Sequence, residues 1–366
     1  MPVALTPAQL TRDLAVRDLT DPAAGPHAVQ LVVERAVAAL AGRWSCAVRR
    51  WPGERIVTAA DNYDNLGYDP ADVTRDARYT RYVDADRMLR SHSSAMIPAA
   101  LRALATSPAD DVLLVCPGVV YRRDSIDRLH SGTPHQLDLW RITRRPMGRA
   151  DLEELAGALL PGRRWRRADR RHSYTVDGAE LDVEHDGAWV EVAECGLAHP
   201  AVLARAGLRE GWSGLALGLG LDRMLMLLKG IPDIRLLRST EPAVAHQMLD
   251  LEPYRPVSAM PSVRRDLSIA VAADDLAEDL GDRVRDALGA GADVVETVEI
   301  RQETPCADLP PQALARLGAS ADQKNLLVRL VLRPTGTTLS DHEANLLRDR
   351  VYAALHRGNV HQWAAR

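Results

Sequence analysis

The sequence predicts an α+β protein built from two domains. Four apolar segments have the length and residue types of strands, and they alternate with segments whose apolar residues recur at helical spacing. The strand-like segments are residues 112–115, 137–142, 179–192 and 215–221. After Pro253 the order becomes strand, helix, strand, strand, helix, which is typical of a compact split βαβ sandwich. We therefore expect a first domain over residues 1–253 and a second over 254–366.

Helix signals support this division. Thr6, Pro7 and Gln9 form a capping-box start with proline at the first helical position. Further helices are expected at residues 27–40, 152–160 and 222–228 of the first domain, and at residues 276–288 and 340–355 of the second. Strands of the second domain are expected at residues 266–271, 294–300 and 326–332.

Composition narrows the class of protein. The chain has 366 residues, 46% of them hydrophobic, and a formal net charge of -4, so no overall basic excess indicates nucleic-acid binding. Its four cysteines lie far apart without CxxC spacing, which argues against a zinc site or a disulfide framework. No leader-like N-terminus and no apolar run of membrane-spanning length is present, so we expect a cytoplasmic protein. The chain contains no phenylalanine.

Polar residues concentrate between two predicted strands, at residues 120–138. Within it, residues 120–127, 130 and 135–138 hold two arginines, three carboxylates, two histidines and an amide. A buried guanidinium is costly unless it is paired, and Arg122 is suited to bidentate contact with phosphate or carboxylate. The segment is either an anion-binding site or a salt-bridged hairpin tip.

Other polar groups have two readings each. His92 and Ser94 precede a helix and face either a ligand or the helix end. Three carboxylates lie on strands, where opposed carboxylates can share a magnesium ion: Asp182, Glu184 and Glu191. The basic run at residues 163–171 is either a nucleic-acid contact or a solvated loop, and residues 63–82 read as an exposed loop.

Two glycines stand two apart on the last strand of the first domain. Gly218 and Gly220 let a flat group approach the backbone closely. The third glycine of a dinucleotide fingerprint is replaced by Arg223, so this is not a Rossmann turn.

These motifs resemble a known family. The Arg122 segment resembles motif 2 of class II aminoacyl-tRNA synthetases, and residues 218–223 resemble motif 3. Residues 121–136, 195–200 and 231–236 are similar to phenylalanyl-tRNA synthetase, and the tail, with residues 264–267 and 338–343, is similar to its ferredoxin-fold anticodon-binding domain. The resemblance implies a class II antiparallel sheet with flanking helices, plus a C-terminal ferredoxin-like α/β sandwich, in the single-chain organelle-type arrangement.

The resemblance also implies roles for individual residues. Arg122 matches the arginine that bridges the amino-acid carboxylate and the α-phosphate of ATP, and Arg223 matches the arginine that holds the γ-phosphate. The remaining expected ATP contacts are Asp124, His130, Gly218 and Gly220. The expected amino-acid contacts are His92, Ser94, Gln136, Asp138, His172, Tyr174 and Ala216. Magnesium is expected at Glu191, with Asp182 as the weaker candidate.

The sequence departs from the family pattern around the amino-acid pocket. His172, Ser173 and Tyr174 replace a Phe-Pro-Phe element, Pro134 replaces the aromatic that stacks on adenine, and Asp138 shortens a glutamate. Leu215 and Leu217 stand where aromatics are common. A ring pair contributes roughly 0.5 to 1.5 kcal/mol, so these losses weaken selection for a phenyl side chain.

The expected function is an ATP-dependent aminoacyl-tRNA ligase of the phenylalanine type, acting with ATP and Mg2+ on an amino acid and a tRNA. One alternative is a paralogue that activates a phenylalanine analogue for resistance or biosynthesis. Another is a non-catalytic tRNA-binding paralogue, which the presence of both Arg122 and Arg223 disfavours. We expect no membrane partner, and a monomer or a homodimer.

Overall fold

The computed structural model describes residues 4–76, 80–257, 261–334 and 338–361, and the chain forms two compact units. The first unit comprises Met1–Arg122, Thr133–Ile231 and Met248–Pro253. The second comprises Arg123–Gly132, Pro232–Gln247 and Tyr254–Arg366. Two segments of the expected first domain, 123–132 and 232–247, therefore belong to the second unit.

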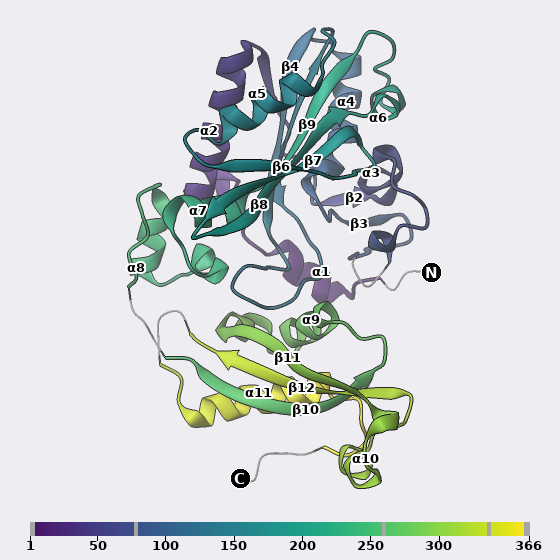
Figure 1. Cartoon of the computed structure of the whole chain (residues 1–366), viewed down its shortest axis with the longest axis vertical. Helices are drawn as coiled ribbons and strands as arrows, with labels where there is room; N and C mark the ends of the chain where they lie inside the picture. Colours follow the sequence, from purple (N-terminus) through teal and green to yellow (C-terminus); the bar gives the residue numbers. More distant parts are fainter. Residues whose placement is uncertain (1–3, 77–79, 258–260, 335–337, 362–366) are drawn as a thin grey trace. The chain divides into compact units, whose positions relative to one another are not determined.

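A seven-stranded sheet forms the centre of the first unit (Figure 1). Its strand order is β1 (Ala47–Arg50), β4 (Asp111–Val119), β5 (His135–Thr143), β9 (Ser213–Gly220), β8 (Ala188–Ala198), β7 (Thr175–His185) and β6 (Trp165–Asp169). Only the β1–β4 pair is parallel, and all other neighbours are antiparallel. A two-stranded ribbon, β2 (Ile56–Thr58) with β3 (Arg87–Leu89), stands apart from this sheet.

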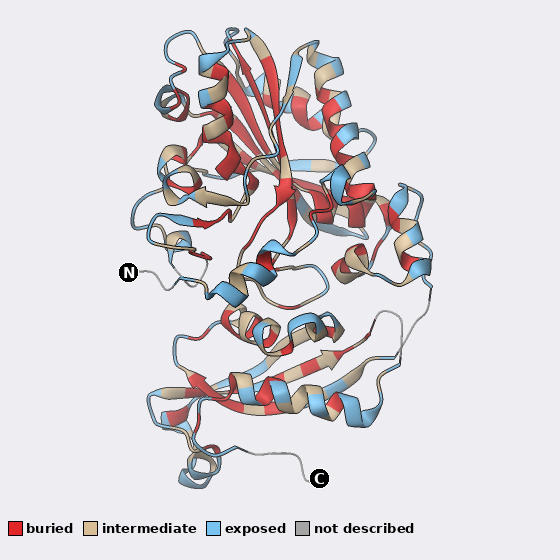
Figure 2. Cartoon of the chain, turned by 180° about the vertical axis from the view of Figure 1, so that it is seen from behind, coloured by how far each residue is buried: buried red, intermediate tan, exposed pale blue. Residues whose placement is uncertain are grey.

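Helices cover both faces of the large sheet. On one face α2 (Ala28–Trp44), α5 (Arg149–Leu159) and α7 (Leu221–Lys229) contact one another and the strands. On the other face α4 (Ile97–Thr106) and α6 (Pro200–Arg205) share an apolar core with Trp140 and Ala216 of the sheet. The central strands are buried along most of their length, as Figure 2 shows. The unit also contains α1 (Pro7–Leu14) and α3 (Ala59–Asn62).

The second unit has its own sheet and core. Strands β10 (Val263–Ala272), β12 (Gln323–Leu332) and β11 (Val295–Pro305) form an antiparallel sheet in that order. Helices α9 (Ala277–Leu288) and α11 (Asp341–Leu355) contribute to one apolar core with these strands, while α8 (Pro242–Ala245) and α10 (Pro311–Leu317) are short.

The segment 123–132 packs within the second unit. Ile126 lies in its apolar core, and its carbonyl accepts a hydrogen bond of 3.0 Å from the Val298 N–H. Arg285 donates to the carbonyls of Asp124 and Ser125 at 2.6 and 2.8 Å. A segment that the sequence places between two strands of the first sheet is thus held by the strands and helices of the second unit.

The expected α+β class is confirmed. The second unit contains the five expected elements in their expected order, but a short helix that the sequence analysis did not predict, α10, lies between β11 and β12. Thr6 caps α1 in a reciprocal capping box with Gln9, as its sequence predicts. The prediction of an exposed loop at 63–82 is wrong at its ends, because Tyr63 and Tyr82 are buried in a small aromatic cluster. No helix within the described residues is long and apolar enough to span a membrane.

His135 ties three elements of the first unit together. Its side chain is fully buried; Nδ1 lies 2.8 Å from the Asp222 carboxylate at the start of α7, and Nε2 accepts from the Leu19 N–H at 3.0 Å. Since Nε2 accepts, the ring is neutral and its proton is on Nδ1. The Asp222 carboxylate also accepts from the His135 N–H at 3.0 Å.

We predict that His135→Ala lowers the free energy of unfolding by about 2 to 4 kcal/mol, because it leaves the buried Leu19 N–H without an acceptor and opens a cavity. Urea unfolding followed by circular dichroism measures this change. The control is His185→Ala, at the more exposed β7–β8 turn. Equal effects from both substitutions would contradict the role given to His135.

Candidate active site

The register of the large sheet places a glycine between two carboxylates. Gly218 of β9 is opposite Asp138 of β5 on one side and opposite Glu194 of β8 on the other. Two residues along the same strand, Gly220 is opposite Gln136. Because side chains alternate along a strand, these residues share one face of the sheet, the face that α4 covers in part.

Both glycines are partly exposed, and a side chain on either would meet only ordinary contacts. A Cβ atom at Gly218 would meet only the Asp138 Oδ2 atom, at 3.9 Å, and one at Gly220 would meet nothing closer than 3.8 Å. Elsewhere the same face is filled, since a Cβ at Gly196 would lie 2.6 Å from the Thr175 side chain and one at Gly214 would lie 2.6 Å from a backbone oxygen. We call the partly exposed stretch of the sheet over Gly218 and Gly220 the trough.

Asp138 forms one wall of the trough. It is 1% exposed, and it accepts hydrogen bonds from Ser93 Oγ, from Ser94 Oγ at 3.1 Å and from Trp140 Nε1 at 3.0 Å. Burial raises the pKa of Asp138 to about 6, although the three donors act in the opposite direction. The carboxylate is therefore ionised at neutral pH, where it attracts a cation.

The 3-10 helix η4 (Ser93–Met96) brings the other expected amino-acid contacts to the same wall. The Ser93 N–H donates to Gln136 Oε1 at 3.1 Å, and Ser94 reaches Asp138. Burial lowers the pKa of His92 to about 4, so this ring is neutral at physiological pH. Its Nε2 lies 3.4 Å from Asn62 Nδ2.

Aromatic rings line the trough next to these groups. Tyr174 stacks on His172 and on Trp140, with ring centroids 5.6 and 6.0 Å apart, and Tyr68 stacks on His92 at 5.6 Å. Tyr68 was not expected in the site, because it lies within a polar stretch that reads as a loop. The one sequence signal for a packed ring is the nearby Tyr63. In the structure the centroids of these two rings lie 5.5 Å apart.

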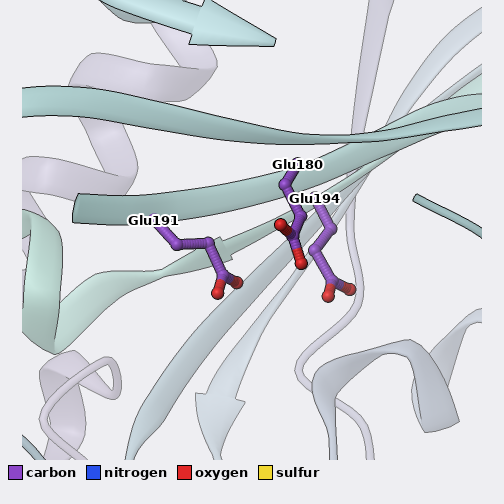
Figure 3. A group of neighbouring side chains, drawn as sticks. All are labelled: Glu180, Glu191 and Glu194. Atoms are coloured by element: carbon purple, nitrogen blue, oxygen red, sulfur yellow. The ribbon is translucent and has the colours of Figure 1, made fainter. Parts of the chain in front are cut away.

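Three carboxylates meet where β7 and β8 pair. Glu180, Glu191 and Glu194 each offer an oxygen, and these atoms lie within 4.8 Å of one another (Figure 3). A register shift in β8, which pairs Leu181 with Ala193 but Asp182 with Glu191, makes this convergence possible.

The charges around this cluster differ from residue to residue. Burial and the nearby Glu194 charge raise the pKa of Glu191. Burial acts to raise the pKa of Glu194 as well, but His172 and Arg170 outweigh it and the pKa is lowered. Hard oxygen ligands of this kind suit Mg2+. Asp182 lies outside the cluster, and its carboxylate accepts from Arg166 at 2.8 Å.

The two expected arginines lie in the first unit. Arg223 is in the first turn of α7, and its Nη1 donates to the Glu191 carbonyl at 2.9 Å, which places the guanidinium beside the carboxylate cluster. Arg122 is half-buried just after the strand β4, and its carbonyl accepts from Arg81 at 3.4 Å.

Asp124 and His130 belong to the segment of the second unit. Asp124 accepts from the Ser125 N–H at 3.0 Å, and His130 Nδ1 lies 2.7 Å from the Asp127 carboxylate. The contact with His130 contributes to lowering the pKa of Asp127 to about 2, against the effect of its burial.

The structure corrects two other expectations. Leu215 and Leu217 are fully buried on the opposite face of the sheet from Gly218, so they do not line the trough. Part of the basic run at 163–171 is a strand, β6, and not a loop. Arginines of the basic run pair with carboxylates of β7, Arg166 with Asp182 at 2.8 Å and Arg164 with Glu184 at 2.6 Å, which weakens the nucleic-acid interpretation.

Residues 19–248 match the family described as tRNA synthetases class II core domain (F). The phenylalanine--tRNA ligase alpha subunit of Prochlorococcus marinus (strain MIT 9313) is 34% identical over 237 residues, which are 61% of this chain and 68% of that protein. The alpha subunit of strain NATL2A is 36% identical over 197 residues, covering 52% of this chain and 56% of the relative. The chain thus spans little more than half the length of the latter.

A more distant alpha subunit, from Nostoc punctiforme, is 30% identical over 251 residues, covering 65% of this chain and 74% of the relative. A solved pyrrolysyl tRNA synthetase, PylSc of Desulfitobacterium hafniense, aligns with a TM-score of 0.45 and 17% identity over 63% of this chain and 78% of its own. That likeness is too weak to bear on the fold or the substrate.

We predict that the free energy of unfolding of the wild type falls relative to that of Asp138→Asn as pH rises. The folded-state pKa of Asp138 is about 6 and its ordinary value is 3.8, so the folded wild type holds the proton more tightly and loses stability as pH rises through this window. The loss amounts to about 3 kcal/mol between about pH 4 and about pH 7, at about 1.4 kcal/mol per pKa unit. Urea unfolding of both proteins across this range measures it, and a pH-independent difference would contradict the assignment.

Proposed function

Because the chain belongs to the phenylalanyl-tRNA synthetase family of class II tRNA synthetases, we propose that it activates an amino acid with ATP and transfers it to a tRNA. The observation that carries this proposal is the trough, the partly exposed stretch over Gly218 and Gly220 with Asp138, Gln136 and Arg223 at its edges. A flat substrate fits against two glycines, while the polar groups at its rim hold the charged ends of the substrates.

The chemistry needs positioning rather than a side-chain nucleophile. The carboxylate of the amino acid attacks the α-phosphorus of ATP, pyrophosphate leaves, and the tRNA 3′ hydroxyl then displaces AMP from the adenylate. Placing the two reactants and neutralising charge supply most of the acceleration in such transfers. Arg122 bridges the carboxylate and the α-phosphate, and Arg223 holds the γ-phosphate.

The amino-acid end of the trough suits a zwitterion. The ionised Asp138 carboxylate, beside Ser94, binds the ammonium group, and Gln136 and His92 lie at the same wall. Ala216, opposite Trp140 in the sheet, forms the floor below the side chain with His172 and Tyr174.

A magnesium ion fits the carboxylate cluster. Glu191 and Glu180 supply oxygens whose mutual repulsion a divalent cation relieves, and Glu194 lies next to them on the side of the trough. The bound ion would neutralise phosphate charge next to Arg223. Asp182 is the weaker ligand candidate, because Arg166 already holds its carboxylate.

We assign the tRNA contact to residues 254–366, as an anticodon-binding domain, and activation to residues 1–253. The supporting feature is that residues 254–366 contain the three strands and two helices expected for that domain, β10, α9, β11, β12 and α11. Asp124 and His130 belong to the second unit, so their expected contacts with adenine and phosphate stay predictions from the sequence. The relatives are alpha subunits by name. We propose that this chain is a monomer or a homodimer, and measuring its molecular mass in solution tests this proposal.

Pyrophosphate exchange with individual amino acids, followed by charging of total tRNA, tests the proposed activity. We expect exchange with at least one aromatic amino acid, and a loss of about 100- to 1000-fold in Arg223→Ala, as for removal of one charge-stabilising donor. Exchange with no amino acid would contradict the proposal and leave a non-catalytic tRNA-binding protein.

Gly218→Ala separates binding from folding. The added methyl group has room, with its nearest neighbour at 3.9 Å, so the melting temperature stays unchanged while the group blocks the trough and exchange is lost. Gly157→Ala, at an open position on α5, is the matched control and keeps full exchange. Full activity of Gly218→Ala would rule out the trough as the site of activation.

The metal assignment makes its own prediction. Glu191→Gln removes one anionic ligand, so we expect the Mg2+ concentration that supports half-maximal exchange to rise about 10- to 100-fold. Glu184→Gln, outside the cluster, is the control. An unchanged magnesium requirement in Glu191→Gln would refute this ligand.

A further inference from the structure

Glu194 is an incompletely satisfied carboxylate in the wall of the trough. Its Oε2 atom lies 3.3 Å from His172 Nε2 and accepts from the Tyr174 hydroxyl at 3.4 Å. Both contacts are long, since charge-assisted hydrogen bonds measure about 2.7 to 2.9 Å. Among the described residues no donor meets Oε1. A carboxylate with this environment has capacity for at least one further hydrogen bond.

Glu194 lies where its carboxylate can accept a hydrogen bond from the side chain of a bound amino acid. Glu194 is opposite Gly218 on β8, while Asp138 is opposite the same glycine on β5. If the ammonium group of a substrate pairs with Asp138, its side chain extends across Gly218 toward Glu194. About a third of the Glu194 side chain remains exposed, so a ligand can reach it.

A second polar group next to the trough also lacks a protein partner. The Tyr68 ring lies against His92 and Tyr174, but its hydroxyl makes no hydrogen bond within the described part of the chain. Burial and the charges of Glu194 and Asp138 raise the pKa of Tyr68, so its hydroxyl keeps its proton at neutral pH and can act as a donor or an acceptor. A pocket for a plain phenyl ring has no use for an acidic and a phenolic oxygen beside the ring.

We infer that Glu194 is a specificity-determining residue, which selects an amino acid with a flat side chain that carries a hydrogen-bond donor, such as a ring hydroxyl, amino group or ring N–H. This inference rests on the proposed function. The stacked rings of Tyr174, His172 and Tyr68 favour a flat side chain over a flexible one. Binding a phenyl group instead would bury the Glu194 carboxylate without a donor, which is the cost that lets such sites reject analogues.

The test measures kcat/KM of pyrophosphate exchange for L-phenylalanine, L-tyrosine, meta-tyrosine, 4-aminophenylalanine, tryptophan and histidine. We expect the best donor-bearing substrate to exceed phenylalanine by about 100-fold or more. In Glu194→Ala this ratio falls to within about tenfold, mainly through loss of the donor-bearing substrate. Glu194→Gln, which keeps an acceptor oxygen, gives an intermediate ratio, and Glu184→Ala leaves the ratio unchanged.

The possible failures are distinct. Exchange that is fastest with phenylalanine overturns this inference and leaves the proposed function standing, whereas no exchange with any amino acid overturns both. A substrate ratio that is the same in Glu194→Ala and the wild type also overturns it. If Glu194→Ala instead raises the magnesium requirement without changing the ratio, Glu194 is a metal ligand and not a specificity residue.

Discussion

The pairing of β9 between β5 and β8 is the constraint on which the site depends. It fixes Gly218 in one cross-strand row with Asp138 and Glu194, and Gly220 in the next row with Gln136. A shift of β9 by one residue would turn its leucines, which lie on the opposite face of the sheet, toward Asp138 and Glu194. The leucines that alternate with the glycines hold the register, because Leu215, Leu217 and Leu219 are buried on that other face.

The buried polar groups around the trough lower the stability of the folded protein. Asp138 is buried and its pKa is raised to about 6, and three glutamate oxygens converge at the β7–β8 bulge. Such features oppose folding, and they are common where a protein binds charged ligands. The apolar core around Trp140 and buried hydrogen bonds, such as the one between His135 and Asp222, offset this loss of stability.

Periodicity and capping patterns sufficed to predict most elements, including α1, α2, α7 and every major strand and helix of the second unit. They could not predict contacts made over long sequence separations. The convergence of Glu191 with Glu180 and Glu194 depends on a bulge, and the packing of Ile126 in the second unit depends on partners more than a hundred residues away. Tyr68 was missed because its polar neighbours mask a ring that packs through tertiary contacts.

The central claim is that the trough over Gly218 holds the amino acid and ATP during activation. A crystal structure with a non-hydrolysable aminoacyl-adenylate analogue tests it most directly. The account predicts electron density for the analogue across Gly218 and Gly220, with its ammonium group at Asp138 and its side chain directed at Glu194. An analogue bound elsewhere, with the space above Gly218 filled by protein or water, would contradict the account.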